Sequence, residues 1–269
     1  MFLKSLSKEQ NTEEESVKKM KIQKTDWDNV APWYDSYLEK SNDSFQEKVI
    51  APNLLRILEI KKGESVLDLA CGQGYFSRLI KNLGASVTGV DLSKDLIKIA
   101  EEKSTDISYI VAPAHDIKLK KESFDKVFTV LAFENIKNVD EVMFEIKRVL
   151  KNDGTFTLVL LHPVFRIPQY SDWGFDSKKD LQYRRTDKYL SEIKIDIEQN
   201  PYKNKGRITT TFHRSLQWYM KAFKKQGFAI TTIEEWISHK KSQIGPRQKA
   251  EDTARKEFPM FLALELRKF

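Results

Sequence analysis

Cysteine is nearly absent from this sequence, and the single residue, Cys71, excludes an intramolecular disulfide and a metal site made of clustered cysteines. Only four histidines occur, and they are scattered along the chain, so we expect no metal. No apolar run approaches the ~18 residues that indicate a membrane span. The first residues turn polar after MFL, which is not typical of a secretory signal. We therefore expect a cytoplasmic protein without a membrane span.

Acidic residues are scarce only in the last third of the chain. Residues 201–269 hold fifteen Lys and Arg against six Asp and Glu, whereas the first 200 residues hold 31 against 33. Such an asymmetry is typical of proteins with an acidic partner, either nucleic acid or an anionic small molecule. A solvated, lysine-rich surface would give the same count, so the charge alone leaves both interpretations open.

The chain divides into a tail and one large domain. Residues 1–24 have almost no large apolar side chains and are predicted to be a mobile tail, which leaves 25–269 as the domain. Within it, apolar periodicity is lost over 162–213. This stretch is predicted to be an insertion that covers the substrate, because loops after strand ends define substrate in open α/β sheets.

Between Glu64 and the insertion, strand-like and helix-like patterns alternate. Repeated alternation predicts parallel strands with right-handed crossovers and helices on both faces. A helix is expected around Phe45–Leu58, disturbed by Pro52. The fold class is therefore a doubly wound α/β sheet of seven strands, mostly parallel, with an antiparallel last strand. The predicted strands are Val66–Ala70, Ser86–Val90, Ile107–Val111, Lys126–Leu131, Thr155–Leu161, Ala229–Trp236 and Met260–Arg267.

The run VLDLACGQGYF, residues 66–76, lies where the first strand ends and a helix begins. Gly72 and Gly74 permit a tight turn against which a ligand can lie close to the backbone. Asp68 stands inside the strand end. Asp91 ends the next strand, at a spacing that suits a carboxylate bonded to ribose hydroxyls.

Two other interpretations of this run are a nicotinamide dehydrogenase and a glycine-rich turn without any ligand. A nicotinamide dehydrogenase would carry a third small residue where Ser77 stands, and it would have little use for the Asp68 carboxylate beside a pyrophosphate. A carboxylate at position 68 suits a ligand that has a cationic amino group and no phosphate, such as S-adenosylmethionine.

The segments DLACGQG, VTGVDLS and APAHDIKL resemble those of the class I S-adenosylmethionine-dependent methyltransferases, in particular the group that includes the ubiquinone and menaquinone methyltransferases. The resemblance covers Trp27–Leu161 and, in architecture, Ser215–Leu266. Ala70 replaces the first glycine of the usual motif.

The resemblance also implies roles for individual residues in binding the cofactor, S-adenosylmethionine. Asp68 would face the methionine amino group, Asp91 the ribose hydroxyls, and Asp116 the adenine amine. The remaining predicted cofactor contacts are Tyr34, Gly72, Gly74, Leu92, Ile117 and Leu131.

A general base is needed only if the methyl acceptor must lose a proton. His162 follows the fifth strand directly, and His213 precedes the last long helix, so either is a candidate base or a structural histidine. Glu134 lies just past the fourth strand and is predicted to contact the acceptor or the sulfonium.

Basic and aromatic residues are expected at the mouth of the site. Insertion residues Arg166, Trp173 and Arg184 are predicted acceptor contacts. The loop after the sixth strand should border the same edge, which adds Lys240, Lys241 and Arg247. This rim predicts a small-molecule or lipid-like acceptor of anionic character. The alternatives are an RNA methyltransferase that uses the basic last third, and a cofactor-binding protein without catalysis.

Overall fold

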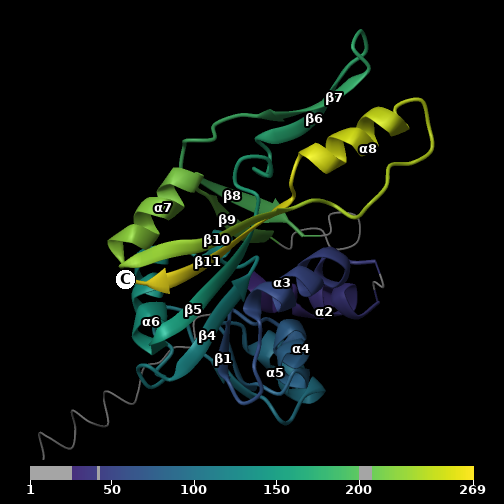
Figure 1. Cartoon of the computed structure of the whole chain (residues 1–269). Helices are drawn as coiled ribbons and strands as arrows, with labels where there is room; N and C mark the ends of the chain where they lie inside the picture. The colour runs from purple at the N-terminus through teal and green to yellow at the C-terminus, as the bar shows by residue number, and fades with distance from the viewer. Residues whose placement is uncertain (1–25, 41–42, 200–207) are drawn as a thin grey trace, which may run out of the picture.

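The computed structural model describes residues 26–40, 43–199 and 208–269, so the predicted tail, 1–24, lies outside the described residues. Its centre is a seven-stranded sheet (Figure 1). The strands are β1 (Ser65–Leu69), β2 (Ser86–Asp91), β3 (Ser108–Val111), β4 (Phe124–Val130), β5 (Leu150–Leu161), β10 (Phe228–Trp236) and β11 (Phe261–Lys268). Their order is β10-β11-β5-β4-β1-β2-β3.

The predicted fold class is confirmed. The strands β1 to β5 pair in parallel, whereas β11 runs antiparallel to both of its neighbours, β10 and β5. The chain between β10 and β11 forms one helix, α8 (Gln248–Glu257), which packs against the insertion instead of crossing the sheet. Without a crossover the returning strand must run in the opposite direction.

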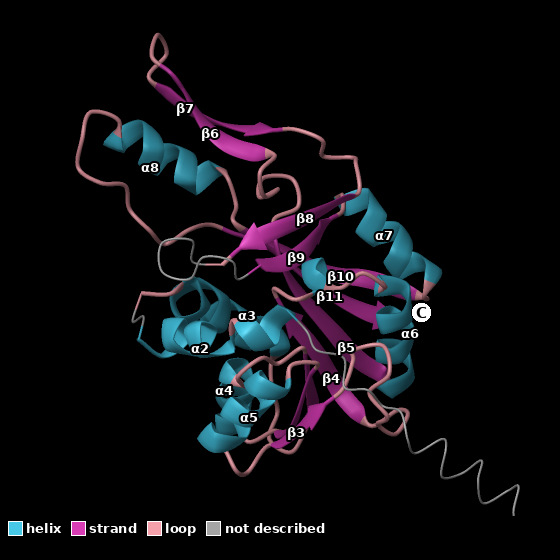
Figure 2. Ribbon diagram, turned by 180° about the vertical axis from the view of Figure 1, so that it is seen from behind, coloured by secondary structure: helices cyan, strands magenta, loops and turns pink. Residues whose placement is uncertain are grey.

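Helices cover both faces of the sheet (Figure 2). On one face, α3 (Ala51–Leu58) and α4 (Tyr75–Asn82) bury Leu54 and Ile80 against β1 and β4. On the other, α6 (Val139–Val149) and α7 (Leu216–Lys225) form a second core with the alternate strand residues. Between β2 and β3 lies α5 (Lys94–Lys103). Burial on both faces explains why the strands are continuous apolar runs.

The predicted helix around Phe45–Leu58 has an irregular start. A π-helical turn, η2 (Gln46–Ile50), leads directly into α3. Pro52 occupies the first turn of α3. Proline lacks a backbone N–H and is tolerated in the first turn of a helix, so the disturbance lies before Pro52 rather than after it.

The predicted insertion forms two hairpins. One joins β6 (Ser171–Asp176) to β7 (Leu181–Thr186), and the other joins β8 (Ile193–Glu198) to β9 (Ile208–His213). Figure 2 shows β8 and β9 over the sheet, whereas β6 and β7 extend outward beside α8. Only the second hairpin therefore lies where it can close a site at the carboxyl ends of the strands.

No helix in the described ranges is long and apolar enough to cross a membrane. Within those same ranges, no group of three or more His, Cys, Asp or Glu side chains is placed to hold a metal ion.

Candidate active site

The turn between β1 and α4 holds three residues in the left-handed region. Ala70 has a φ of 59°, Gly72 of 55° and Gly74 of 75°. A Cβ on Gly74 would lie 2.3 Å from the Tyr109 hydroxyl, so this position requires glycine for space as well as for conformation. Ala70, which takes the place of a glycine, adopts the same strained region with a side chain.

Asp91 joins the ends of β1 and β2. Its Oδ2 accepts a hydrogen bond of 2.9 Å from the Gly72 N–H, and its Oδ1 accepts one of 2.8 Å from the Ser93 N–H. Burial raises the pKa of this carboxyl above its usual range, and the two backbone donors oppose that rise. The carboxylate is therefore fixed at the mouth of the glycine turn.

A cavity of about 370 Å³ opens beside this carboxylate. Its walls come from the ends of β1, β2 and β4 and from the N-terminal helices η1 (Asp26–Asn29) and α2 (Ala31–Lys40). We call it the cofactor cavity. It is lined by Trp27, Tyr34, Ala70, Gly72, Val90, Asp91, Leu92, Leu96, Ala112, Pro113, Ala114, His115, Val130, Leu131, Ala132, Asn135, Ile136, Lys137, Asn138 and Val142.

Asp68 lies in a smaller hollow that continues the cofactor cavity and shares Tyr34, Ala70, Gly72 and Val130 with it. Its Oδ2 accepts a hydrogen bond of 2.6 Å from the Ser77 hydroxyl. Burial raises the pKa of Asp68 to about 7, and the nearby Asp91 charge adds to the rise. A cation placed beside Asp68 would restore its ionised form.

The structure brings most of the predicted cofactor residues together. Tyr34, Gly72, Asp91, Leu92 and Leu131 line the cofactor cavity, and Asp68 lines its extension. Gly74 caps α4 and packs on Tyr109.

Two predicted adenine contacts lie elsewhere. Asp116 pairs with Lys118 at 2.7 Å, and Ile117 is 1% exposed within the core near α6. Neither lines the cavity, whereas Trp27 and the segment 112–115 do. For Trp27, the cluster of aromatic residues around it is the signal in the sequence that could have identified it as a lining residue.

A second cavity, of about 260 Å³, adjoins the first, and we call it the acceptor cavity. The two cavities share Trp27, Tyr34, Leu131 and Asn135. Its other walls come from η2, from the short helix after β4, from β5 and the chain after it, and from β8, β9 and α7. The lining residues are Gln46, Glu134, Leu160, Leu161, Pro163, Arg166, Pro168, Ile197, Gln199, Thr209, Thr211, Phe212, His213, Arg214 and Tyr219.

Glu134 belongs to a short 3-10 helix, η3 (Phe133–Asn135), that follows β4. Its Oε1 accepts a long hydrogen bond of 3.4 Å from the Leu161 N–H, and its Oε2 is buried without a partner among the described residues. Burial raises the pKa of Glu134 to about 7, which the charge of Arg214 partly opposes.

The two candidate histidines differ in position. His162 lies outside both cavities. Its Nδ1 accepts from the Val164 N–H at 3.3 Å, so its Nε2 donates to Glu235, 2.7 Å away. His213 lines the acceptor cavity, and its Nε2 donates to the Tyr189 carbonyl at 2.8 Å. Burial lowers the pKa of both rings below the usual value.

Of the predicted insertion contacts, only Arg166 lines the acceptor cavity. Two guanidinium groups lie over the Trp173 ring. That of Arg166 is 5.6 Å from the ring centre, and that of Arg184 is 5.1 Å from it. Arg184 donates to the carbonyls of Phe165 and Ser171, so it holds the insertion together.

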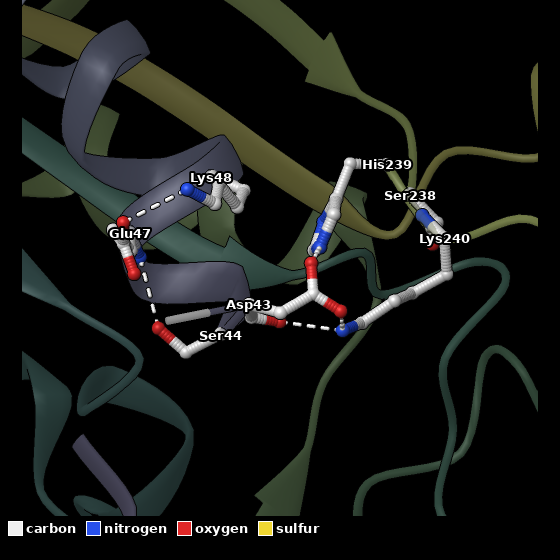
Figure 3. Close-up of polar contacts among 7 residues, drawn as sticks. All are labelled: Asp43, Ser44, Glu47, Lys48, Ser238, His239 and Lys240. Atoms are coloured by element: carbon white, nitrogen blue, oxygen red, sulfur yellow. Dashed lines mark hydrogen bonds and ion pairs between the residues drawn. The ribbon is translucent and has the colours of Figure 1, made fainter. Parts of the chain in front are cut away.

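The residues of the predicted basic rim form contacts away from both cavities. Lys240 and His239 both bind the Asp43 carboxylate, next to the start of η2 (Figure 3). Arg247 stacks on Phe175 at 4.4 Å, and Lys241 lies with it in a shallow hollow near α8. None of Lys240, Lys241 and Arg247 lines either cavity.

The sequence and the fold are similar to those of known proteins. Residues 67–158 match the model of the methyltransferase domain family. A crystal structure of an S-adenosylmethionine dependent methyltransferase from Mesorhizobium loti is 28% identical and covers 81% of this chain and 96% of that one, with a TM-score of 0.64. The chain belongs to the class I S-adenosylmethionine-dependent methyltransferases. It is an enzyme of this class, and S-adenosylmethionine is its cofactor.

Two curated methyltransferases match part of the chain. A demethylmenaquinone methyltransferase of Thermotoga maritima is 37% identical over 109 residues, which are 40% of this chain and 47% of that protein. A malonyl-[acyl-carrier protein] O-methyltransferase of Pectobacterium atrosepticum is 24% identical over 180 residues, 65% of each chain. The methyltransferase thus spans about half to two thirds of the length of these relatives.

The residues present fit the cofactor. Gly72 leaves room beside its Cα, since a Cβ there would meet nothing closer than the Tyr34 ring at 3.6 Å. Asp68 and Asp91 supply two buried carboxylates, and no Lys or Arg of the described residues lines the hollow around Asp68, which suits a ligand with ribose hydroxyls and an amino group.

Proposed function

We propose that this methyltransferase transfers the methyl group to a small-molecule acceptor bound in the acceptor cavity. The observation that carries the proposal is that the two cavities meet at Tyr34 and Leu131. An acceptor in the second cavity would lie next to a cofactor in the first, and alignment of two bound reactants is a large part of such catalysis.

When bound, S-adenosylmethionine supplies a methyl group that its sulfonium already activates. The chain's own residues then bind the two reactants, orient them and exclude water. Asp91 and the Gly72 turn would fix the donor. Trp27 and Tyr34, which pack edge to face with ring centres 5.6 Å apart, would close both cavities against solvent.

The size and walls of the acceptor cavity support a small acceptor. A cavity of about 260 Å³ that is lined by apolar and polar side chains in similar numbers suits a compact, partly apolar molecule. The relatives are named for acting on demethylmenaquinone and malonyl-[acyl-carrier protein], which also fits an acceptor that is not nucleic acid.

The experiment incubates the enzyme with cofactor labelled in its methyl group against fractionated low-mass metabolites and, separately, total tRNA and rRNA. We expect label in a low-mass product, and none when Asp91→Ala replaces the wild type. Lys241→Glu, which lies outside both cavities, serves as the charge control and should label the same product. Label transferred to RNA alone would overturn the proposal.

A further inference from the structure

The acceptor cavity concentrates polar groups that have no partner. Three of its lining side chains carry a buried atom without a hydrogen bond among the described residues: Gln46 Oε1, Glu134 Oε2 and Arg166 Nε. Buried polar atoms in native proteins are nearly always bonded, so each exception calls for an explanation. A ligand that supplies the missing hydrogen-bond partners would explain all three.

The Glu134 carboxyl is poised to accept a proton. The charge of Arg214 acts on this carboxyl, but the Arg214 guanidinium donates its hydrogen bonds to the carbonyls of Ile136 and Lys137, at 2.9 Å and 2.8 Å. Besides Glu134 and Arg214, the titratable groups that line the same cavity are His213, Arg166 and two tyrosines, Tyr34 and Tyr219, whose pKa values are raised by burial. No ion pair therefore holds Glu134 in its charged form among the described residues.

Arg166 brings a positive charge to the same cavity without a counter-ion among the described residues. No carboxylate in the described part of the chain forms an ion pair with its guanidinium. Burial and the neighbouring charges of Arg184 and Arg255 lower the pKa of Arg166 to about 10, so it is still a cation at neutral pH. An anion brought to this guanidinium would relieve both the desolvation and the repulsion.

We propose that the acceptor cavity binds a molecule with two polar groups, an O–H or N–H nucleophile that donates to Glu134 and an anionic group that accepts from Arg166. Glu134 is then the catalytic base of methyl transfer. This inference rests on the proposed function and names the acceptor class.

The nucleophile's lone pair forms the bond to the methyl carbon, and the carbon–sulfur bond breaks with its electron pair remaining on sulfur. The proton leaves the nucleophile for Glu134 Oε2, and its bonding pair stays on the nucleophile. Glu134 then returns the proton to solvent when the product leaves. The glutamate must therefore be ionised when the acceptor binds.

The first arm of the test identifies the charge of the acceptor. A low-mass metabolite extract is passed over an anion exchanger, and the retained and unretained fractions are each incubated with labelled cofactor and enzyme. We expect the acceptor in the retained fraction. An acceptor that is methylated but found only in the unretained fraction overturns this inference and leaves the proposed function standing. If neither fraction yields a labelled product, both the inference and the proposed function are overturned.

The second arm uses the retained fraction as substrate. Arg166→Gln should raise the half-saturating amount about tenfold with little change in kcat. Arg185→Gln is its matched control: it removes an equal charge from the same insertion, but Arg185 pairs with Asp187 and does not line the cavity, so the half-saturating amount should be unchanged. Equal effects of the two variants would overturn the role of Arg166.

Glu134→Gln should lower kcat by at least about 100-fold and remove the loss of rate that we expect of the wild type below about pH 7. The affinity for S-adenosylhomocysteine, measured by calorimetry, should not change, which shows that the variant folds. His213→Asn should retain the wild-type pH profile. If His213→Asn removes the acidic limb and Glu134→Gln retains it, the base is the histidine and the inference fails.

Discussion

The Asp91 carboxylate accepts a hydrogen bond of 2.9 Å from the Gly72 N–H, a residue 19 positions earlier in the chain. This bond joins the ends of β1 and β2 before any ligand arrives. One side chain therefore shapes the glycine turn and offers its remaining lone pairs to the cofactor cavity.

Asp91→Ala should weaken binding of S-adenosylhomocysteine by about 2–3 kcal/mol, because two hydrogen bonds to the ligand are lost and buried groups are left without partners. Calorimetry measures the affinity. Asp116→Asn is the control, since Asp116 pairs with Lys118 and does not line the cavity. A larger loss from Asp116→Asn than from Asp91→Ala would show that the adenine site involves Asp116 after all.

Ala70→Gly should stabilise the protein by about 0.5–1 kcal/mol. Ala70 has a φ of 59°, and the strain relieved there exceeds the entropy that glycine adds to the unfolded chain. Ala132, also in the cofactor cavity, has a φ of −122°. Ala132→Gly should therefore destabilise, and chemical denaturation compares the two. A loss of stability in both variants would mean that Ala70 carries no strain.

Binding of S-adenosylhomocysteine at pH 7 should release a fraction of a proton. The pKa of Asp68 is about 7 in the folded protein, so the carboxyl is partly protonated, and the ligand's amino group would favour the ionised form. Calorimetry in two buffers of different ionisation enthalpy measures the release. Asp68→Asn should abolish it, and Glu134→Gln should not.

The same shift affects stability. Between pH 4 and 7 the folded protein holds a proton on Asp68 that the unfolded chain has lost, so the free energy of unfolding falls as pH rises through this window. Asp68→Asn should make this fall shallower. A stability that is independent of Asp68 across the window would contradict its raised pKa.

The helices η1 and α2 should behave as a lid. Asp28 Oδ1 accepts a hydrogen bond of 2.6 Å from the Ser93 hydroxyl, and Asp35 forms an ion pair with Lys103, so the lid rests on α5. Cofactor beneath Tyr34 adds contacts to this small interface. Amide hydrogen exchange over 26–40 should slow when S-adenosylhomocysteine is added, while β11 is unaffected. Equal rates with and without ligand would identify Tyr34 as an ordinary core residue.

The sequence by itself determined the sheet and the place of the glycine turn and two carboxylates at its edge. The strands are short runs buried on both faces, and residues that follow such strands must meet at one edge of a parallel sheet. Gly72, Asp91 and Asp68 could therefore be placed from order and spacing alone, and the absence of a crossover helix fixed the direction of β11.

Only the tertiary structure decided which charged residues reach the acceptor cavity. Glu134 and Arg166 line it, whereas Lys240 binds Asp43 and Arg247 stacks on Phe175. The sequence predicts that a loop emerges at an edge, but its final course depends on packing between distant elements. Here α8 packs against the β6–β7 hairpin, and that contact draws the basic loop away from the site.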